Sequence, residues 1–169
     1  MKTIIILLIL AVSASNSIAK AYFAREMEMV TNAEFIAIVN VQWTSEFKET
    51  TPFPYQVATG TVERVLKGEQ PEAISFHVPT FYPCAVTEVH AGRYLVFLRK
   101  EFGALQGNNW YYSYRPISDG IIEWYKDTNT LDMAEMPLES VVQQIEEQMK
   151  NPQQAGAGYP PQSVGSPDP

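Results

Sequence analysis

Residues Gly92 to Arg99, GRYLVFLR, are the stretch that decides the fold. The unbroken apolar run Tyr94–Leu98 places large side chains on both faces of an extended strand, because successive side chains alternate between the two faces. Apolar residues on both faces are typical of a strand that is covered on both sides. We therefore expect this strand to lie at the centre of a barrel or sheet.

Other β-rich segments flank the central strand on both sides. Residues 34–43, 55–66 and 73–78 precede it, and residues 110–115 and 120–125 follow it. Gly60, inside the second of these segments, predicts a bulge or a sharp bend. The pair Asp119-Gly120 predicts a tight turn before the last strand.

Helical spacing of apolar residues appears at the two ends of this β-rich region. It predicts a short helix that begins after the first twenty residues and ends near Asn32, and a longer helix over residues 137–150. The fold class expected is therefore mostly β: a small antiparallel OB-like barrel of about six strands, with a short N-terminal helix and a C-terminal helix.

The first 21 residues have the pattern of a cleavable signal peptide. Lys2 precedes the apolar run Ile4–Val12, and small residues that suit cleavage after Ala19 or Ala21 follow. The apolar run is shorter than the roughly 20 residues that a membrane-spanning helix needs. We therefore expect a secreted or periplasmic protein with no stable membrane insertion after cleavage; an uncleaved N-terminal anchor is the alternative.

The expected organisation is a signal peptide (1–21), one barrel domain (22–150) and a tail (151–169). The tail contains five prolines and three glycines among its 19 residues, which predicts disorder. The whole chain has a formal net charge of −7. Loss of Lys2 and Lys20 with the signal peptide changes this charge to −9. So acidic a domain repels phosphate backbones, and nucleic acid is not an expected partner.

Three segments resemble the netrin-like, tissue-inhibitor-of-metalloproteinase-like group of OB-fold barrels. They are Val62–Gly68 (VERVLKG), Pro83-Cys84 and Ala91–Leu98 (AGRYLVFL), and the resemblance covers roughly residues 22–150. It implies the barrel fold and, by analogy, a protein partner. The inhibitors of this group chelate the protease zinc with a Cys at the mature N-terminus, which this chain lacks, so their inhibitory mechanism does not carry over.

Cys84 is the only cysteine, and it excludes an intrachain disulfide. It is a candidate reactive thiol; burial and pairing with another molecule are the alternatives. His77 and His90 are candidate bases for it, although spacing alone does not bring them into contact. No cysteine and histidine spacing suits zinc, and Asp127, Asn129 and Asp132 read as a polar turn rather than a calcium loop. We expect no catalytic residues, metal or cofactor.

Aromatic residues concentrate in the last two predicted strands. If these strands pair, one aromatic face is expected in the core and the other offers a stacking platform for a sugar or a partner protein. The alternative is that the rings pair across strands and stabilise the sheet. The candidate ligand-binding residues are Trp110, Tyr112, Tyr114, Arg115 and Trp124.

The function expected from these features is that of a secreted or periplasmic, non-enzymatic binding domain with a protein or glycan ligand. Two alternatives stay open. One is a structural envelope protein, and the other is an enzyme or redox protein that depends on Cys84. The sequence does not determine the ligand or the oligomeric state.

Overall fold

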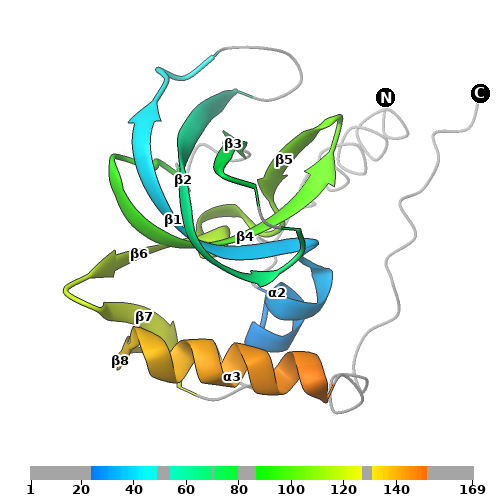
Figure 1. Ribbon diagram of the computed structural model, residues 1–169, viewed down its shortest axis with the longest axis vertical. Coiled ribbons are helices and arrows are strands. Elements are labelled where there is room, and N and C mark those ends of the chain that lie inside the picture. The colour runs from blue at the N-terminus through cyan, green and yellow to red at the C-terminus, as the bar shows by residue number, and fades with distance from the viewer. Residues whose placement is uncertain (1–23, 49–53, 70, 80–86, 127–130, 152–169) are drawn as a thin grey trace, which may run out of the picture.

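The structure is a computed structural model that describes residues 24–48, 54–69, 71–79, 87–126 and 131–151 (Figure 1). The side chains of Trp110 and Tyr111 are not among those described. The expected signal peptide, Cys84 and residues 152–169 of the expected tail lie outside the described residues. None of the described helices is long and apolar enough to cross a bilayer.

Five strands close into a barrel, which confirms the expected fold class. Their order is β1-β2-β3-β5-β4, and β4 pairs with β1 to complete the circle. Every pairing in the barrel is antiparallel except a single parallel contact between β3 and β5 at His77 and Gln106. The barrel strands are β1 (Phe35–Thr44), β2 (Tyr55–Lys67), β3 (Ala73–Pro79), β4 (Gly92–Glu101) and β5 (Ala104–Gly107).

The central strand predicted from GRYLVFLR is β4, and its two faces lie in two different cores. Val96 and Leu98 point into the barrel, where they pack with Phe76 of β3. Leu95 and Phe97 point outward but remain buried, because a second layer covers that side of the strand. Burial on both faces explains why the sequence of β4 is apolar at both even and odd positions.

The second layer consists of two helices and a three-stranded extension. Strands β6 (Tyr114–Ser118), β7 (Ile121–Tyr125) and β8 (Met133–Pro137) continue the sheet beyond β4. Helices α2 (Glu26–Asn32) and α3 (Leu138–Lys150) pack on the core that this layer shares with the barrel. In Figure 1 this layer occupies the lower part of the molecule, with α3 at the bottom and the barrel above.

The expected elements differ from the observed ones mainly near residue 110. Residues 110–115 were expected to form a strand, but Trp110–Ser113 is a 3₁₀ turn and β6 begins only at Tyr114. The Ser113 hydroxyl accepts a hydrogen bond from the Asn109 amide at 2.6 Å, which stabilises the turn. Strands β5 and β8 have no recognisable sequence pattern, because β5 has only four residues and β8 shows no clear alternation.

Candidate binding surface

The predicted aromatic platform is mostly buried. Tyr112, Tyr114 and Trp124 are 8%, 4% and 0% exposed, and Trp110 has no described side chain. The described members therefore form no exposed stacking surface. Two features bury these rings: the 3₁₀ turn carries Tyr112 onto the core beside Tyr125, and Trp124 of β7 packs in the core formed with α2 and α3.

Trp124 and its neighbour Tyr125 make stacking and hydrogen-bond contacts inside the core. Its indole stacks on Phe97 with ring centroids 5.5 Å apart, and its Nε1 donates a hydrogen bond of 3.1 Å to the buried carboxylate of Glu26. Tyr125 packs edge-on against Trp124, and its hydroxyl donates to the Ala24 carbonyl at 2.6 Å. Burial raises the pKa of Tyr125 to about 12. These contacts attach α2 to β7 and serve the core.

Arg115 is likewise buried, at 3% exposure, and it does not extend toward a ligand. Its guanidinium lies 4.5 Å from the centre of the Tyr112 ring and 3.4 Å from the Glu123 carboxylate. A buried guanidinium is stabilised by contacts of these two kinds. Arg115, predicted as a candidate ligand-binding residue, therefore makes its described contacts inside the second layer.

Three further residues were considered for chemistry in the sequence: Cys84 as a reactive thiol, and His77 and His90 as its bases. Cys84, the candidate reactive thiol, lies outside the described residues. Of the two candidate bases, His77 lies on β3, and His90 is a 70% exposed side chain 3.9 Å from Glu88. Within the described ranges, no three His, Cys, Asp or Glu side chains gather as metal ligands would.

A different aromatic surface is exposed at the opposite end of the molecule. Trp43, at the end of β1, is 55% exposed, and Phe47 after it is 37% exposed. On the same side of the barrel, the Tyr55 and His77 rings stack 4.3 Å apart at an angle of 20°. We define the β1–β3 outer face as the solvent-facing surface formed by Trp43 of β1, by Tyr55, Val57 and Thr59 of β2, and by Ser75 and His77 of β3.

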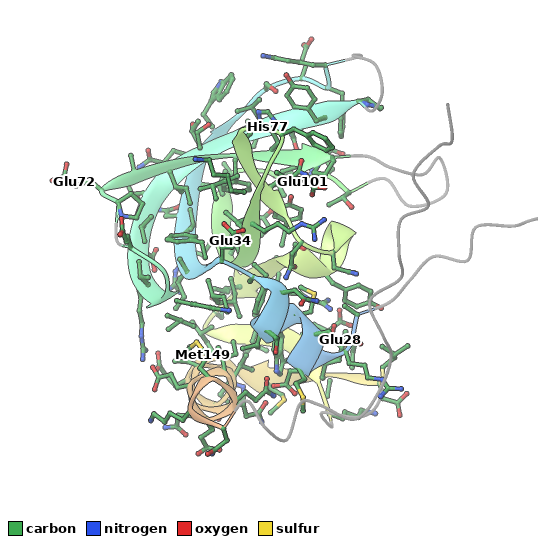
Figure 2. All side chains as sticks on the ribbon, turned by 90° about the vertical axis from the view of Figure 1, so that its right-hand side faces the viewer. Glu28, Glu34, Glu72, His77, Glu101 and Met149 are labelled. Carbon is green, nitrogen blue, oxygen red and sulfur yellow. The ribbon has the colours of Figure 1, made fainter. Side chains whose placement is uncertain are left out.

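The strand register joins these side chains into one surface. Trp43 pairs with Thr59 on β2, and Thr59 in turn pairs with Ser75 on β3. The next row contains Val57 and His77, which are direct partners. The outer face therefore crosses three strands without a break. Figure 2 shows His77 at the end of the molecule remote from Met149 of α3.

A β-bulge explains why Trp43 is exposed. Val39 and Val41 have the same parity as Trp43, yet both point into the barrel and are fully buried. The register shifts between Val41, which pairs with Gly60, and Trp43, which pairs with Thr59, so Gln42 is an extra residue on β1. The extra residue turns Trp43 to the outer face.

Gly60 allows the two strands to approach at this bulge. A Cβ atom at Gly60 would lie 2.3 Å from the carbonyl oxygen of Asn40, which no side chain permits. The bulge predicted at Gly60 is thus confirmed, and it was the one sequence signal for the exposure of Trp43. Trp43 could not be recognised as exposed from the sequence, because the effect of a bulge at Gly60 on β1 depends on how the two strands pair.

Electrostatics keep His77 neutral near pH 7. Partial burial under Tyr55, and then the positive charge of Lys48, lower the pKa of the His77 imidazole. A neutral imidazole offers one hydrogen-bond donor and one acceptor. The outer face therefore combines stacked rings with a neutral polar group, a combination suited to contact with a protein or a sugar.

The lowered pKa of His77 predicts a pH dependence of stability. The unfolded chain takes up a proton near pH 6.5, whereas the folded chain takes it up only at lower pH. The contribution of neutral His77 is thus fully present above about pH 6.5 and is lost as the pH falls toward the folded pKa. Urea unfolding measured from pH 7.5 to pH 5 should show this loss.

A His77→Phe variant, which keeps a ring to stack on Tyr55, should flatten that part of the pH profile. His90→Gln controls for the loss of a histidine at an exposed position. A His77→Phe profile parallel to that of the unmodified chain would show that the imidazole does not cause the effect.

Comparison with known proteins adds no relative: the chain matches no family model, no curated protein and no solved structure. The fold and the outer face define a small closed β-barrel with an exposed aromatic surface. The resemblance to netrin-like domains is tested by none of these comparisons and stays a proposal.

Proposed function

We propose that this chain is a non-enzymatic binding domain that acts outside the cytoplasm and recognises a protein or glycan through the β1–β3 outer face. The observation that carries the proposal is the exposure of Trp43, at 55%, on the same face as the Tyr55–His77 stack. Tryptophan and tyrosine dominate the energetics of many interfaces, and a soluble domain gains little stability from leaving a tryptophan in water.

The extracytoplasmic part of the proposal is supported by the sequence alone. Lys2, the apolar run Ile4–Val12 and the small residues after it have the order found in signal peptides. Netrin-like resemblance supports a protein partner by analogy. The alternatives are a structural envelope protein and an enzyme dependent on Cys84, a residue outside the described part of the chain.

The test is a capture experiment with the exported full-length chain. The bait is exposed to envelope extract, culture medium and an immobilised glycan array, in parallel with a Trp43→Ala variant. We expect a species that the unmodified chain retains and that Trp43→Ala retains about tenfold less, because a central aromatic side chain commonly contributes more than 1.4 kcal/mol to binding.

Ile121→Ala is the control, since Ile121 is an apolar residue of β7 that is 39% exposed and lies outside the outer face. It should leave binding unchanged. Equal retention by the unmodified chain and Trp43→Ala would contradict the assignment of the face, and an absence of any retained species would favour the structural alternative.

A further inference from the structure

The tip of the β4–β5 hairpin carries an aromatic side chain in an unusual place. Phe102 is 90% exposed, more than any other large apolar residue in the described part of the chain. It stands between Glu101 and Ala104, which pair across the hairpin, and Gly103 completes a two-residue turn. Figure 1 shows the hairpin projecting at the upper right of the barrel.

The backbone at Phe102 is in the left-handed region. Its φ is +50°, and that of Gly103 is +82°. Two-residue turns with positive φ at both central positions favour Asn-Gly or Asp-Gly, because a bulky side chain at the first position is strained there. Phenylalanine at this position therefore lowers the stability of the turn and also exposes an apolar ring to water.

A second two-residue turn in this chain has the same backbone geometry but carries the residues that this geometry favours. The β6–β7 hairpin turns through Asp119 and Gly120, with φ values of +51° and +75°, between the paired residues Ser118 and Ile121. Two turns with matching backbone geometry thus carry different first residues. The difference at Phe102 is not required by the fold and calls for another cause.

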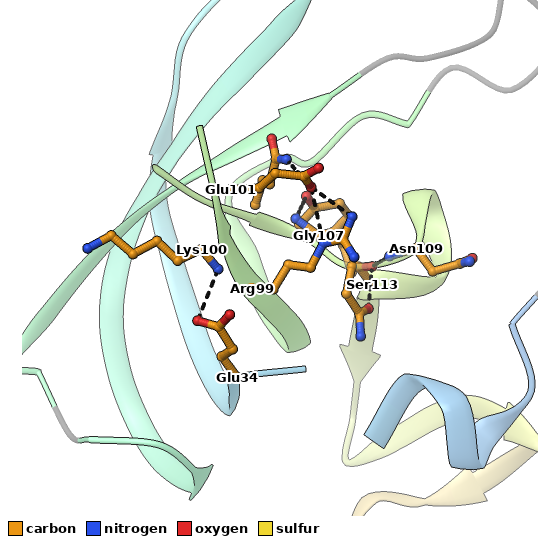
Figure 3. A network of polar contacts seen from close by, with 10 residues as sticks. Glu34, Arg99, Lys100, Glu101, Gly107, Asn109 and Ser113 are labelled. Atoms are coloured by element: carbon orange, nitrogen blue, oxygen red, sulfur yellow. Dashed lines mark hydrogen bonds and ion pairs between the residues drawn. The ribbon is translucent and has the colours of Figure 1, made fainter. Parts of the chain in front are cut away.

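A network of polar contacts fixes the base of the Phe102 hairpin. Oε2 of Glu101 accepts hydrogen bonds from Nη2 of Arg99 at 2.8 Å and from Nε2 of Gln106 at 2.6 Å, and Figure 3 shows this cross-strand cluster. Gln106 is itself 93% buried, since only 7% of its surface is exposed. A tip on so constrained a base loses little conformational freedom when it binds.

We propose that Phe102 is a preorganised anchor that inserts its ring into an apolar pocket on a partner protein. The partner must be concave, because the hairpin tip is convex and has no groove of its own. A sugar cannot enclose such a tip. The net charge of the whole chain, −7, disfavours an anionic membrane as the surface that receives the ring.

The substitution Phe102→Asn separates binding from stability, because the two should change in opposite directions. Relief of the left-handed strain should raise Tm by about 2–4 °C. Removal of the ring should weaken partner binding by about tenfold or more. Asp119→Phe is the matched reverse substitution: it should lower Tm by a similar amount and leave partner binding unchanged.

The binding partner is found with the photoreactive analogue p-benzoylphenylalanine at position 102 of the full-length chain, exposed to envelope extract and culture medium. The same label at position 119 is the control. The proposal is supported if one protein is cross-linked from position 102 only, and if that protein, once purified, binds Phe102→Asn about tenfold or more weakly than the unmodified chain.

Any of four results would overturn the proposal. Three concern the protein itself: no protein adduct specific to position 102, equal partner affinity for Phe102→Asn, or a lower Tm in that variant. The fourth is ring-dependent binding to phosphatidylcholine vesicles, with or without phosphatidylglycerol, instead of to a protein. The proposed function fails separately. It depends on Trp43, so a species retained by Phe102→Asn and lost from Trp43→Ala would keep the outer face and reject only the anchor.

Discussion

Trp124→Ala is expected to lower the free energy of unfolding by about 3–5 kcal/mol, enough to unfold a marginally stable domain of this size. The indole is completely buried, so its removal leaves a cavity between Phe97 and Tyr125. It also deprives the buried Glu26 carboxylate of the Nε1 donor, which adds a desolvation cost. Urea unfolding followed by far-UV circular dichroism measures the change.

Trp43→Ala is the matched control for this prediction. The same substitution at a residue with 55% exposure should change stability by no more than about 0.5 kcal/mol. Similar losses at both positions would contradict the division into a buried core tryptophan and an exposed surface tryptophan. The pair also separates the two roles, since Trp124→Ala should affect folding and Trp43→Ala should affect binding.

Tyr114→Phe is expected to cost about 2–4 kcal/mol through the loss of one oxygen atom. The buried Tyr114 hydroxyl donates to the His77 carbonyl at 2.7 Å and accepts from the Gly107 amide at 2.6 Å. It thereby joins β3 to β5, where the described strands share a single ladder pair. Removal leaves the buried Gly107 amide and the partly buried His77 carbonyl without this partner, and a buried group left in this way costs about 1–3 kcal/mol.

Amide hydrogen exchange identifies where Tyr114→Phe acts. Exchange should accelerate first at Gly107, because its amide loses its hydrogen-bond acceptor. Tyr55→Phe is the control, because Tyr55 is a half-buried tyrosine of the outer face. It should leave the amides around Gly107 protected. A stability loss below about 0.5 kcal/mol for Tyr114→Phe would show that the hydroxyl does not hold the barrel closed.

The barrel could be predicted from the sequence because its strands carry regular patterns. The apolar run of β4 requires cover on both faces, and the structure provides it with the barrel interior and the second layer. The turn at Asp119-Gly120 has the positive φ values that those residues favour. Patterns of this kind are local, so one chain is enough to recognise them.

The candidate site could not be predicted in the same way. Aromatic residues around Trp124 are as compatible with a core as with a platform, and only the position of α2 and α3 decides between them. The exposure of Trp43 depends on one extra residue in β1, which reverses the parity of everything after it. A register shift is a property of two strands together, and a single stretch of sequence does not reveal it.

The exposure of Phe102 could not be predicted for a different reason, which lies in the sequence of a single turn. The turn Glu101–Ala104 has a glycine at its second central position, which suits a two-residue hairpin. Its first central residue is phenylalanine, whereas sequence rules for such turns expect Asn or Asp, so the turn could not be predicted. Local rules thus fail at both exposed aromatic residues that we assign to binding, and they also fail at the 3₁₀ turn Trp110–Ser113, which serves the core. Departures from local preference commonly mark functional positions.

The measurement that tests the central claim most directly is hydrogen–deuterium exchange of the full-length chain with and without the species captured by the unmodified protein. If the β1–β3 outer face is the binding surface, protection should increase over residues 41–47, 55–59 and 75–77 and stay unchanged over α3 and β8 at the opposite end. Protection confined to α3, β7 or β8, with none around Trp43, would contradict it.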